Sequence, residues 1–322
     1  MNPSRIDDMP PIGFGLWKVS RDDCADVVHQ AIRAGYRHFD GACDYGNETE
    51  VGAGITRALD EGLCTREELW ITSKLWNTYH APEHVAPAFE RSLSDLGLDY
   101  LDLYLVHFPI ALAYVPFETR YPPEWIFDPE AAEPRMVTAP VPLEQTWRAM
   151  EALKDDGRAR HIGVCNYSSG LLHDLMSYAR RPPELLQIEA HPQLAQPRLL
   201  RLAKQYGLAV TAFSPLGALS YLELDMATPA ESVLDDPRVR SIAERVGCSP
   251  AQAVLAWHLA RGTSVVVKST NAARMQENLA ADRITLSAED LSTIDELDVN
   301  RRYNDPGAFC EAAFGTFHPI YD

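Results

Sequence analysis

The sequence of 322 residues lacks any long hydrophobic run. A membrane-spanning helix needs roughly 20 consecutive apolar residues, so the sequence predicts no such helix. The first residues, MNPSRIDDMPP, also lack the apolar segment of a secretory signal peptide. We therefore expect a cytoplasmic protein.

Closely spaced cysteines and an excess of positive charge are also absent. A formal net charge of −17 opposes binding to nucleic acid or to anionic membrane surfaces, so any anionic ligand must find a local cluster of cations. The expected partner is a small molecule. No CxxC pair and no zinc-type spacing occurs, so we interpret the cysteines as reduced thiols and predict no metal site. The six are Cys24, Cys43, Cys64, Cys165, Cys248 and Cys310.

A glycine-rich phosphate turn is missing after the first predicted strand. The early glycine cluster, GFGLWK at 13–18, precedes that strand and lacks the third glycine of the dinucleotide-binding fingerprint. This argues against a nucleotide-binding Rossmann half.

The pattern that is present alternates strands with helices. Amphipathic stretches with helix start and stop signals separate the strands: Ser20 to Gly35, Pro142 to Gly157, and Ser249 to Gly262. The strand-like runs are nearly continuous in apolar residues, which is typical of parallel strands buried on both faces. These runs are 36–40, 69–76, 101–108, 161–167, 185–191, 208–214 and 263–269, with a weaker eighth at 283–286.

Eight such units over the whole length favour a single (β/α)8 TIM barrel domain, residues 1–322, over an open sheet. Two aromatic-rich segments interrupt the alternation, a proline-rich insertion at 110–142 and the tail at 301–322. A loop as long as 110–142 is more often a functional lid than a linker. We expect both to be long loops at the carboxyl end of the barrel, where barrel enzymes build their sites.

Polar residues stand at the ends of three successive predicted strands. Asp40 ends the first, Lys74 lies near the end of the second, His107 near the end of the third, and Tyr45 follows in the loop after Asp40. Each alone has a structural explanation: a turn-forming aspartate, an outward-pointing lysine, a core histidine and a packed tyrosine. Because strand ends converge in a barrel, we expect all four to meet.

Such a set can donate a proton from a phenol. A free tyrosine has a pKa of about 10, too high for efficient acid catalysis near neutral pH. A nearby ammonium lowers that pKa, and a carboxylate keeps the ammonium charged. Asp40 would therefore hold Lys74, Lys74 would activate Tyr45 to protonate a carbonyl oxygen, and His107 would orient the substrate.

The sequence resembles the aldo-keto reductases and, within them, is most similar to the xylose reductases. The resemblance covers nearly the whole chain and implies NAD(P)H-dependent reduction of an aldehyde to an alcohol, with the tetrad Asp40, Tyr45, Lys74 and His107. It also implies an N-terminal β-hairpin on the barrel. A histidine at 107 suggests carbonyl rather than double-bond reduction. The motifs that carry the resemblance are FDGACDYGNE (39–48), SKLWN (73–77), LVHFPIA (105–111), IGVCNYS (162–168), QIEAHP (187–192), FSPLGALSYLEL (213–224) and VVKSTNAARMQEN (266–278).

The resemblance also implies where an extended NADPH would bind. Asn166 and Gln187 would meet the nicotinamide carboxamide, and Phe213 would stack on its ring. Cys165 stands where many relatives have a serine, and a thiol is a weaker donor. Ala218 likewise replaces a pyrophosphate-binding serine. The remaining cofactor positions are Ser214, Leu216 and Ser220 at the pyrophosphate, Glu223 at the ribose hydroxyls, Lys268, Ser269 and Arg274 around the adenosine 2′-phosphate, and Thr270, Glu277 and Asn278.

Two features of the adenosine positions bear on cofactor choice. Lys268 and Arg274 suit the 2′-phosphate of NADPH, whereas Glu223 suits the ribose hydroxyls of NADH. We expect a preference for NADPH with usable NADH.

The substrate positions of xylose reductases correspond to Trp17, Asp44, Trp76, Phe108 and Asn304. Polar groups against tryptophan faces suit an open-chain aldose such as xylose. In the tail, Gly307-Ala308-Phe309 stands where a tryptophan is expected, so sugar selectivity can differ.

Other functions stay open. A sugar-phosphate or general aldehyde reductase is the nearest alternative, with Lys18, Arg120, Arg301 or Arg302 as phosphate partners. A cofactor-sensing regulatory subunit would call for an interaction extension or a degraded tetrad, and the sequence has neither. The sequence does not decide between a monomer and a homodimer, nor the physiological substrate or the direction of flux.

Overall fold

The computed structural model describes residues 6–321. Residues 1–5, which begin the segment used to argue against a signal peptide, and residue 322 of the predicted tail lie outside the described part. Within it, eight parallel strands pair in chain order and close into a barrel. The strands are β1 (Ile12–Gly15), β2 (His38–Asp40), β3 (Trp70–Leu75), β4 (Leu101–Val106), β5 (Ala159–Cys165), β6 (Leu185–Glu189), β7 (Ala209–Phe213) and β8 (Ser264–Val267).

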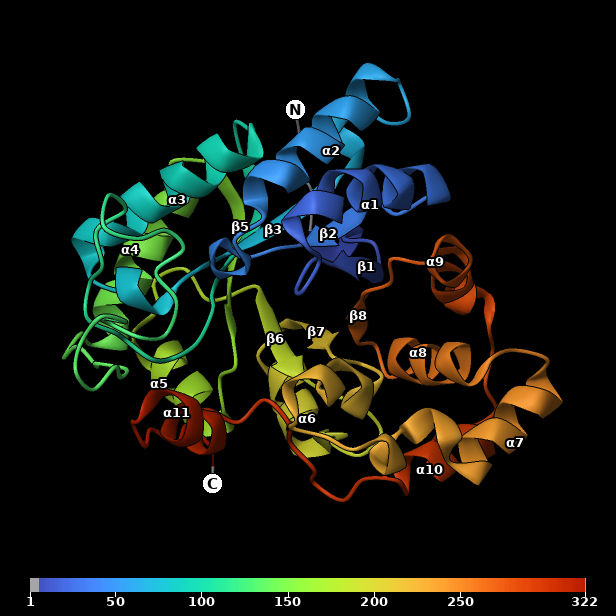
Figure 1. Ribbon diagram of the computed structural model, residues 1–322. Coiled ribbons are helices and arrows are strands. Elements are labelled where there is room, and N and C mark those ends of the chain that lie inside the picture. Colours follow the sequence, from blue (N-terminus) through green and yellow to red (C-terminus); the bar gives the residue numbers. More distant parts are fainter. Residues whose placement is uncertain (1–5, 322) are drawn as a thin grey trace.

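Helices surround the strands and cover the outside of the barrel (Figure 1). The predicted (β/α)8 fold is therefore confirmed. The helices are α1 (Arg21–Ala34), α2 (Glu48–Asp60), α3 (Pro82–Leu96), α4 (Leu143–Asp155), α5 (Ser169–Tyr178), α6 (Pro197–Gln205), α7 (Pro237–Val246), α8 (Pro250–Ala260), α9 (Ala272–Leu279), α10 (Ala288–Asp295) and α11 (Pro306–Phe314).

The helix signals read from the sequence act as expected. At the start of α1, the Ser20 hydroxyl accepts a hydrogen bond from the backbone N–H of Asp23. Gly35 ends the helix with a φ of 109°, a left-handed conformation that glycine adopts without steric cost. Helix α8 begins with a capping box between Ser249 and Gln252.

Burial of the strands explains their apolar sequences. Every residue of β3 and β4 is buried, because the inner face packs in the barrel and the outer face packs under the helices. A charged residue inside such a strand is therefore costly unless it is paired. Lys74 is such a residue, since it lies within β3.

The prediction of the eighth strand at 283–286 is wrong. A 3₁₀ turn, η9 (Ala280–Arg283), is followed by irregular chain up to α10. The missing strand is β1, which pairs in parallel with β2 and β8. A β-carbon at Gly13 would lie 2.7 Å from the ring of the buried His38. The glycines weaken the strand signal of this segment in the sequence, and Gly13 allows β1 to pack closely against His38.

The structure also differs from the predicted N-terminal hairpin. Both neighbours of β1 are parallel to it, so β1 is a barrel strand and not an arm of a hairpin. Before it, the described chain has only a short 3₁₀ turn, η1 (Ile6–Asp8).

The two long segments differ in their secondary structure. The insertion at 110–142 contains one antiparallel bridge, between Leu112 and Thr138. The tail forms α11, and the chain approaches it from α10 past α6 (Figure 1). The tail and the insertion meet where Met136 N–H donates to the carbonyl of Phe314, at 2.9 Å.

The remaining sequence-based exclusions concern metals, disulfides and membranes. All six cysteines are free thiols. Within residues 6–321 we find no cluster of three metal-ligating side chains. None of the helices in this range has the length and apolar character needed to cross a bilayer.

Candidate active site

Four polar residues far apart in the sequence come together at the carboxyl ends of β2, β3 and β4. Asp40 is the last residue of β2, Lys74 is the penultimate residue of β3, and His107 directly follows β4. Tyr45 ends a short 3₁₀ turn, η2 (Cys43–Tyr45), just beyond β2. The convergence of strand ends thus brings together the residues that the sequence predicted to meet.

Lys74 lies at the centre of this group. Its ammonium nitrogen is 2.5 Å from Asp40 Oδ1, 2.8 Å from the carbonyl oxygen of Gly41 and 3.3 Å from the Tyr45 hydroxyl. Lys74 is fully buried and Asp40 is nearly so. A buried charge pair of this kind is stable only with good geometry and further hydrogen bonds, and both are present.

The charge of Lys74 is fixed by its neighbours. Burial lowers the pKa of the ammonium, but the carboxylate of Asp40 and the nearby phenol outweigh burial, and the net pKa is raised. Lys74 is therefore a permanent cation at neutral pH. It is positioned to stabilise negative charge that forms on the Tyr45 oxygen.

The pKa of Tyr45 departs from the sequence-based expectation. Burial raises the pKa of the phenol, and the opposing effect of Lys74 is smaller, so the net pKa lies above that of a free tyrosine. The expectation of a lowered pKa is wrong because it counted the ammonium and left out desolvation. The phenol is fully protonated near neutral pH, as a general acid must be before it reacts.

His107 is neutral. Burial, followed by the nearby charge of Lys74, holds the pKa of the imidazole well below its usual range. Its Nδ1 is buried with no hydrogen-bond partner among the described residues. A proton on Nδ1 would leave an unsatisfied buried N–H, so the tautomer protonated at Nε2 is favoured. The ring packs edge-on against Tyr45, with centroids 5.8 Å apart.

The residues expected around a nicotinamide carboxamide lie beside this group. Asn166 follows β5 in a left-handed conformation, with a φ of 64°, and its side-chain nitrogen donates to the carbonyl of His107 at 2.9 Å. Gln187, in β6, donates from Nε2 to Asp40 Oδ2 at 2.6 Å, so its Oε1 remains as an acceptor. Cys165 points its sulfur toward that oxygen, 3.7 Å away. These amides fit a carboxamide, which both donates and accepts hydrogen bonds.

The loop after β7, residues 214–235, contains the predicted pyrophosphate residues. Phe213 is half-buried, as a ring-stacking surface must be. Ser214 has a φ of 49°, which is uncommon outside glycine and turns the chain sharply after the strand. Leu216 is half-buried at the start of the next turn, η5 (Gly217–Ser220). Ala218 is fully buried and offers no hydroxyl.

Lys18, in the segment between β1 and α1, contacts this loop. Its ammonium donates to the carbonyl of Ser220 at 2.6 Å and pairs with Glu223 at 3.3 Å. Glu223, expected at the ribose hydroxyls, is thus engaged by Lys18 and largely exposed.

The residues expected around the adenosine phosphate gather before and within α9. Lys268, Thr270 and Arg274 are exposed, and Ser269 is buried, with its hydroxyl accepting from the backbone N–H of Asn271 at 3.1 Å. Two exposed cations at the positive end of a helix dipole suit an anion. Farther along α9, Glu277 is half-buried and Asn278 is buried.

Aromatic rings surround the tetrad on the substrate side. Trp76 packs edge-on against His107 at 5.3 Å and against Phe108 at 6.2 Å between centroids. Trp125, from the insertion at 110–142, packs against Trp76 at 4.9 Å. It also packs against Phe309 of α11 at 5.4 Å. The insertion and the tail therefore meet over the predicted site.

Three more residues are expected at the substrate, namely Asp44, Asn304 and Trp17. Burial, and then the charge of Glu124, raise the pKa of the Asp44 carboxyl to about 8, so it is mostly protonated at neutral pH. Asn304 has its backbone N–H bonded to Glu189 Oε2 at 2.9 Å, and its Oδ1 is buried with no partner in the described chain. Trp17 is half-buried against Tyr221, with centroids 6.0 Å apart.

Three residues that the sequence did not single out complete the site. Trp125 packs against Trp76, and Glu189 accepts a hydrogen bond from the backbone N–H of Asn304. The Tyr321 hydroxyl lies 3.3 Å from Asn166 Oδ1. A charged residue inside the apolar strand 185–191 was a usable signal for Glu189. The tryptophan in PPEW was a weaker one, and nothing local marked Tyr321.

Comparisons with known proteins agree with this geometry. Residues 11–299 match the model of the aldo/keto reductase family. A probable NAD(P)H-dependent D-xylose reductase from Arthroderma otae is 50% identical over 97% of this chain and 94% of its own length. An NAD(P)H-dependent D-xylose reductase from Aspergillus niger is 47% identical over 98% and 96%. A solved aldose reductase from Giardia lamblia has a TM-score of 0.84, with 35% identity over 98% of this chain and 99% of that one. The chain belongs to the aldo/keto reductase family.

Proposed function

We propose that this protein reduces the carbonyl group of open-chain aldoses such as D-xylose, and of unhindered aldehydes, to alcohols, with NADPH as the preferred reductant. The observation that carries this proposal is the buried chain of contacts from Asp40 through Lys74 to Tyr45, beside a neutral His107. The relatives named D-xylose reductases, at 47–50% identity, support the substrate class.

The chemistry needs a hydride and a proton. A nicotinamide held by Asn166 and Gln187 would supply the hydride to the carbonyl carbon. The carbonyl oxygen takes the proton of the Tyr45 hydroxyl, so the aldehyde becomes an alcohol and Tyr45 becomes a phenolate. Lys74, 3.3 Å from that oxygen, stabilises the phenolate, and Asp40 keeps the lysine charged and in place.

His107 and Tyr45 have separate roles in this scheme. A raised pKa keeps Tyr45 protonated until the substrate oxygen gains negative charge and becomes the stronger base. His107, protonated at Nε2, donates a hydrogen bond to the same oxygen and so orients the carbonyl. Two donors at one oxygen fit an aldehyde better than a group without a polarised oxygen.

Cofactor preference rests on charge at the adenosine end. Lys268 and Arg274 are exposed cations near the start of α9, where a 2′-phosphate would add negative charge. Glu223 is engaged by Lys18, and this weakens the case for an NADH-specific carboxylate. We expect NADPH to be preferred and NADH to be usable.

The substrate pocket favours a neutral sugar over a sugar phosphate. Three of the cations considered as phosphate partners have internal partners: Lys18 bonds to Ser220 and Glu223, Arg120 bonds to backbone carbonyls of its own loop, and Arg301 pairs with Glu231. Asp44 and Asn304 provide uncharged polar groups, as the hydroxyls of an aldose require.

A steady-state assay of cofactor oxidation tests this function. Xylose, glucose 6-phosphate and a simple aromatic aldehyde should be compared with NADPH and with NADH. We expect turnover of xylose and the aromatic aldehyde, with higher kcat/KM for NADPH. Strict NADH dependence, or turnover of the phosphate ester alone, would contradict the proposal.

The matched variant is Tyr45→Phe. It removes only the hydroxyl, so carbonyl reduction should fall at least about 100-fold while NADPH still quenches protein fluorescence on binding. Robust turnover in this variant would remove Tyr45 as the acid.

The remaining expectations concern assembly and location. We expect a monomer or homodimer in the cytoplasm, where small aldehydes and NADPH are its partners. Analytical ultracentrifugation of the purified chain measures the oligomeric state directly.

A further inference from the structure

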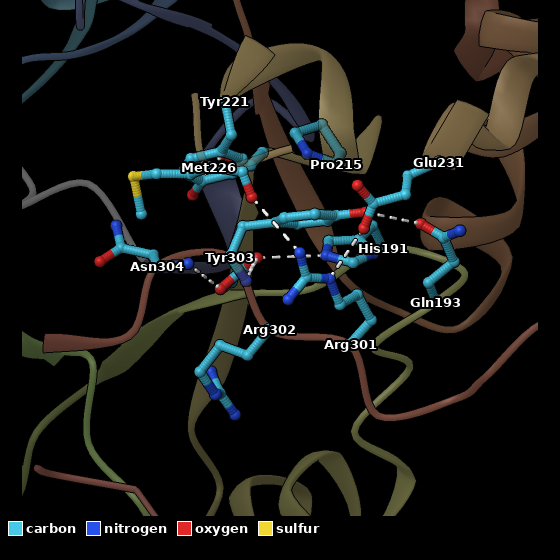
Figure 2. A network of polar contacts seen from close by, with 12 residues as sticks. His191, Gln193, Pro215, Tyr221, Met226, Glu231, Arg301, Arg302, Tyr303 and Asn304 are labelled. Atoms are coloured by element: carbon cyan, nitrogen blue, oxygen red, sulfur yellow. Dashed lines mark hydrogen bonds and ion pairs between the residues drawn. The ribbon is translucent and has the colours of Figure 1, made fainter. Parts of the chain in front are cut away.

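Residues 301–304 of the tail lie between the loop that follows β7 and the end of β6 (Figure 2). The loop, residues 214–235, is the segment expected to cover the cofactor. The same four residues include Asn304, which the sequence predicts at the substrate. One short segment therefore connects the loop expected over the cofactor to a residue expected at the substrate.

A buried carboxylate fixes the backbone of this segment. Glu189, fully buried at the end of β6, accepts hydrogen bonds from the backbone N–H groups of Tyr303 and Asn304, both at 2.9 Å. His191 Nε2 is a third neighbour, 3.2 Å from the same carboxylate. Hydrogen bonds to a buried charge are strong, so Asn304 has a defined position on the barrel wall.

Arg301 connects the other side of the segment to the loop. Its Nε donates to Glu231 Oε1 at 2.9 Å and its terminal nitrogen donates to the carbonyl of Met226 at 3.3 Å. The guanidinium also lies over the ring of Tyr303, 4.6 Å from the centroid. Figure 2 shows Arg301 between Glu231 and Met226. The pKa of Glu231 is lowered mainly by hydrogen bonds from Thr228 and further by the charge of Arg301. The pair is therefore ionised at neutral pH.

The packing beside this ion pair is incomplete. Tyr303 stacks on Tyr221 of the loop, with centroids 5.2 Å apart and planes at 19°, and the Ser214 and Tyr221 hydroxyls are 3.1 Å apart. Toward the solvent, a cavity of about 350 Å³ is lined by residues between 230 and 238 and between 297 and 299, although Val233 and Leu297 belong to one buried apolar cluster. The polar contacts at Arg301 therefore act together with apolar packing to hold this part of the loop against the tail.

We propose that Arg301 is a positioning residue that couples cofactor retention to aldose binding. Its contacts with Glu231 and Met226 hold the loop over the cofactor, and its backbone continues into the segment that Glu189 fixes with Asn304. Opening of the loop to release the cofactor would break these contacts of Arg301 and, through the backbone of residues 301–304, loosen the segment that carries Asn304. The inference rests on the proposed function, because it assigns the loop to NADPH.

The variant Arg301→Gln tests the coupling. Arg301 is exposed, so the variant should fold. Stopped-flow fluorescence should show NADPH leaving roughly threefold faster, the scale of one exposed ion pair, and the KM for xylose should rise by a similar factor. Glu231→Gln should reproduce both effects, and the double variant should be no worse than either single variant, because all three break the same pair.

A matched control separates this role from a general loss of surface charge. Arg238→Gln removes an arginine at the start of α7, directly after the loop, that pairs with Asp236 at 2.9 Å and bonds to none of the tail residues that the structure describes. It should leave NADPH release and the xylose KM unchanged. Exposed ion pairs are screened at about 1 M salt. The NADPH release rate and the xylose KM of Arg301→Gln should then approach the wild-type values.

Three results would overturn the coupling. The first is wild-type release rates in both Arg301→Gln and Glu231→Gln. The second is faster release with an unchanged KM for xylose, since the loop would then be held independently of the substrate pocket. The third is equal effects in Arg238→Gln. A wild-type protein that binds no NADPH would instead overturn the proposed function, and the coupling with it.

Discussion

Gln187 donates its amide hydrogen to Asp40 Oδ2 at 2.6 Å, while Lys74 contacts the other oxygen of the same carboxylate at 2.5 Å. The residue expected to hold the nicotinamide is therefore bonded directly to the carboxylate that orients the catalytic lysine. This bond also fixes which way the Gln187 amide faces, with its oxygen left for a ligand. Under the proposed function, cofactor recognition and proton donation would share one hydrogen-bond network.

Replacing Gln187 with methionine should impair both functions at once. The variant leaves one oxygen of a buried carboxylate without its partner, and such a loss is worth about 1.5–3 kcal/mol. We expect kcat for xylose to fall roughly tenfold or more and NADPH to bind more weakly, measured by steady-state kinetics and fluorescence titration. The exposed Gln145, on α4, gives a matched control: Gln145→Met should change neither value. Weaker binding with an unchanged kcat would show that Asp40 does not need this bond.

Asp44 should produce a pH dependence that is specific to sugars. Its carboxyl has a pKa of about 8 and is neutral below that pH. A sugar that packs against it would remove more water and further disfavour the charged form, so the neutral form should bind aldoses better. We expect kcat/KM for xylose to fall as pH rises through about 8. Asp44→Asn should lack this step, and an aromatic aldehyde without hydroxyls should not show it in either protein. A persistent step in Asp44→Asn would assign the ionisation elsewhere.

Trp125 should matter for substrate binding although it lies far from the tetrad in sequence. Its ring contacts Trp76 and Phe309, so Trp125→Ala removes the bridge between the insertion and the tail. An aromatic pair is worth about 0.5–1.5 kcal/mol, which predicts a rise of roughly fivefold in the KM for aldehydes with kcat little changed. Phe127→Ala is the control, because this neighbour is exposed. Equal effects of the two variants would argue against a specific wall.

Gly13 should be intolerant of a side chain, whereas Gly15 should accept one. A β-carbon at Gly13 would lie 2.7 Å from the buried ring of His38, but at Gly15 the nearest atom would be 3.9 Å away. We expect Gly13→Ala to lower the free energy of unfolding by about 1–3 kcal/mol, and Gly15→Ala to change it by less than about 0.5 kcal/mol. Urea denaturation followed by circular dichroism measures both. Equal stabilities would mean that His38 can move.

The strands that were predicted and the strand that was missed differ in their local signal. The run at 101–108 is long and continuously apolar, and β4 lies within it. IGFG has only four residues, and two of them are glycines, which rarely occur in strands, so the segment alone gives little strand signal. The glycine at position 13 is explained only by the neighbouring His38, which lies in another strand. RITL has β-branched residues but is irregular, because β1 already fills the place between β8 and β2.

The site shows the same division. Proximity of Asp40, Lys74 and His107 follows from barrel topology, since parallel strand ends must converge. The contacts of Trp125 and the pairing of Arg301 with Glu231 join loops with no regular period, so local patterns do not specify them. The direction of the Tyr45 pKa shift was also mispredicted, since it depends on the depth of burial, which no single motif encodes.

The tetrad stands on or directly beside strands of the closed barrel, as do Trp76 and Phe108, whereas Trp125 and Phe309 belong to segments that leave it. Under the proposed function, an exchange of residues 110–142 and 301–321 between relatives would therefore change part of the aromatic surface around the substrate and leave the proposed acid, Tyr45, in place. We therefore expect these two segments to be where sugar preference can change without change to the tetrad, both in evolution and in a mutant library confined to them.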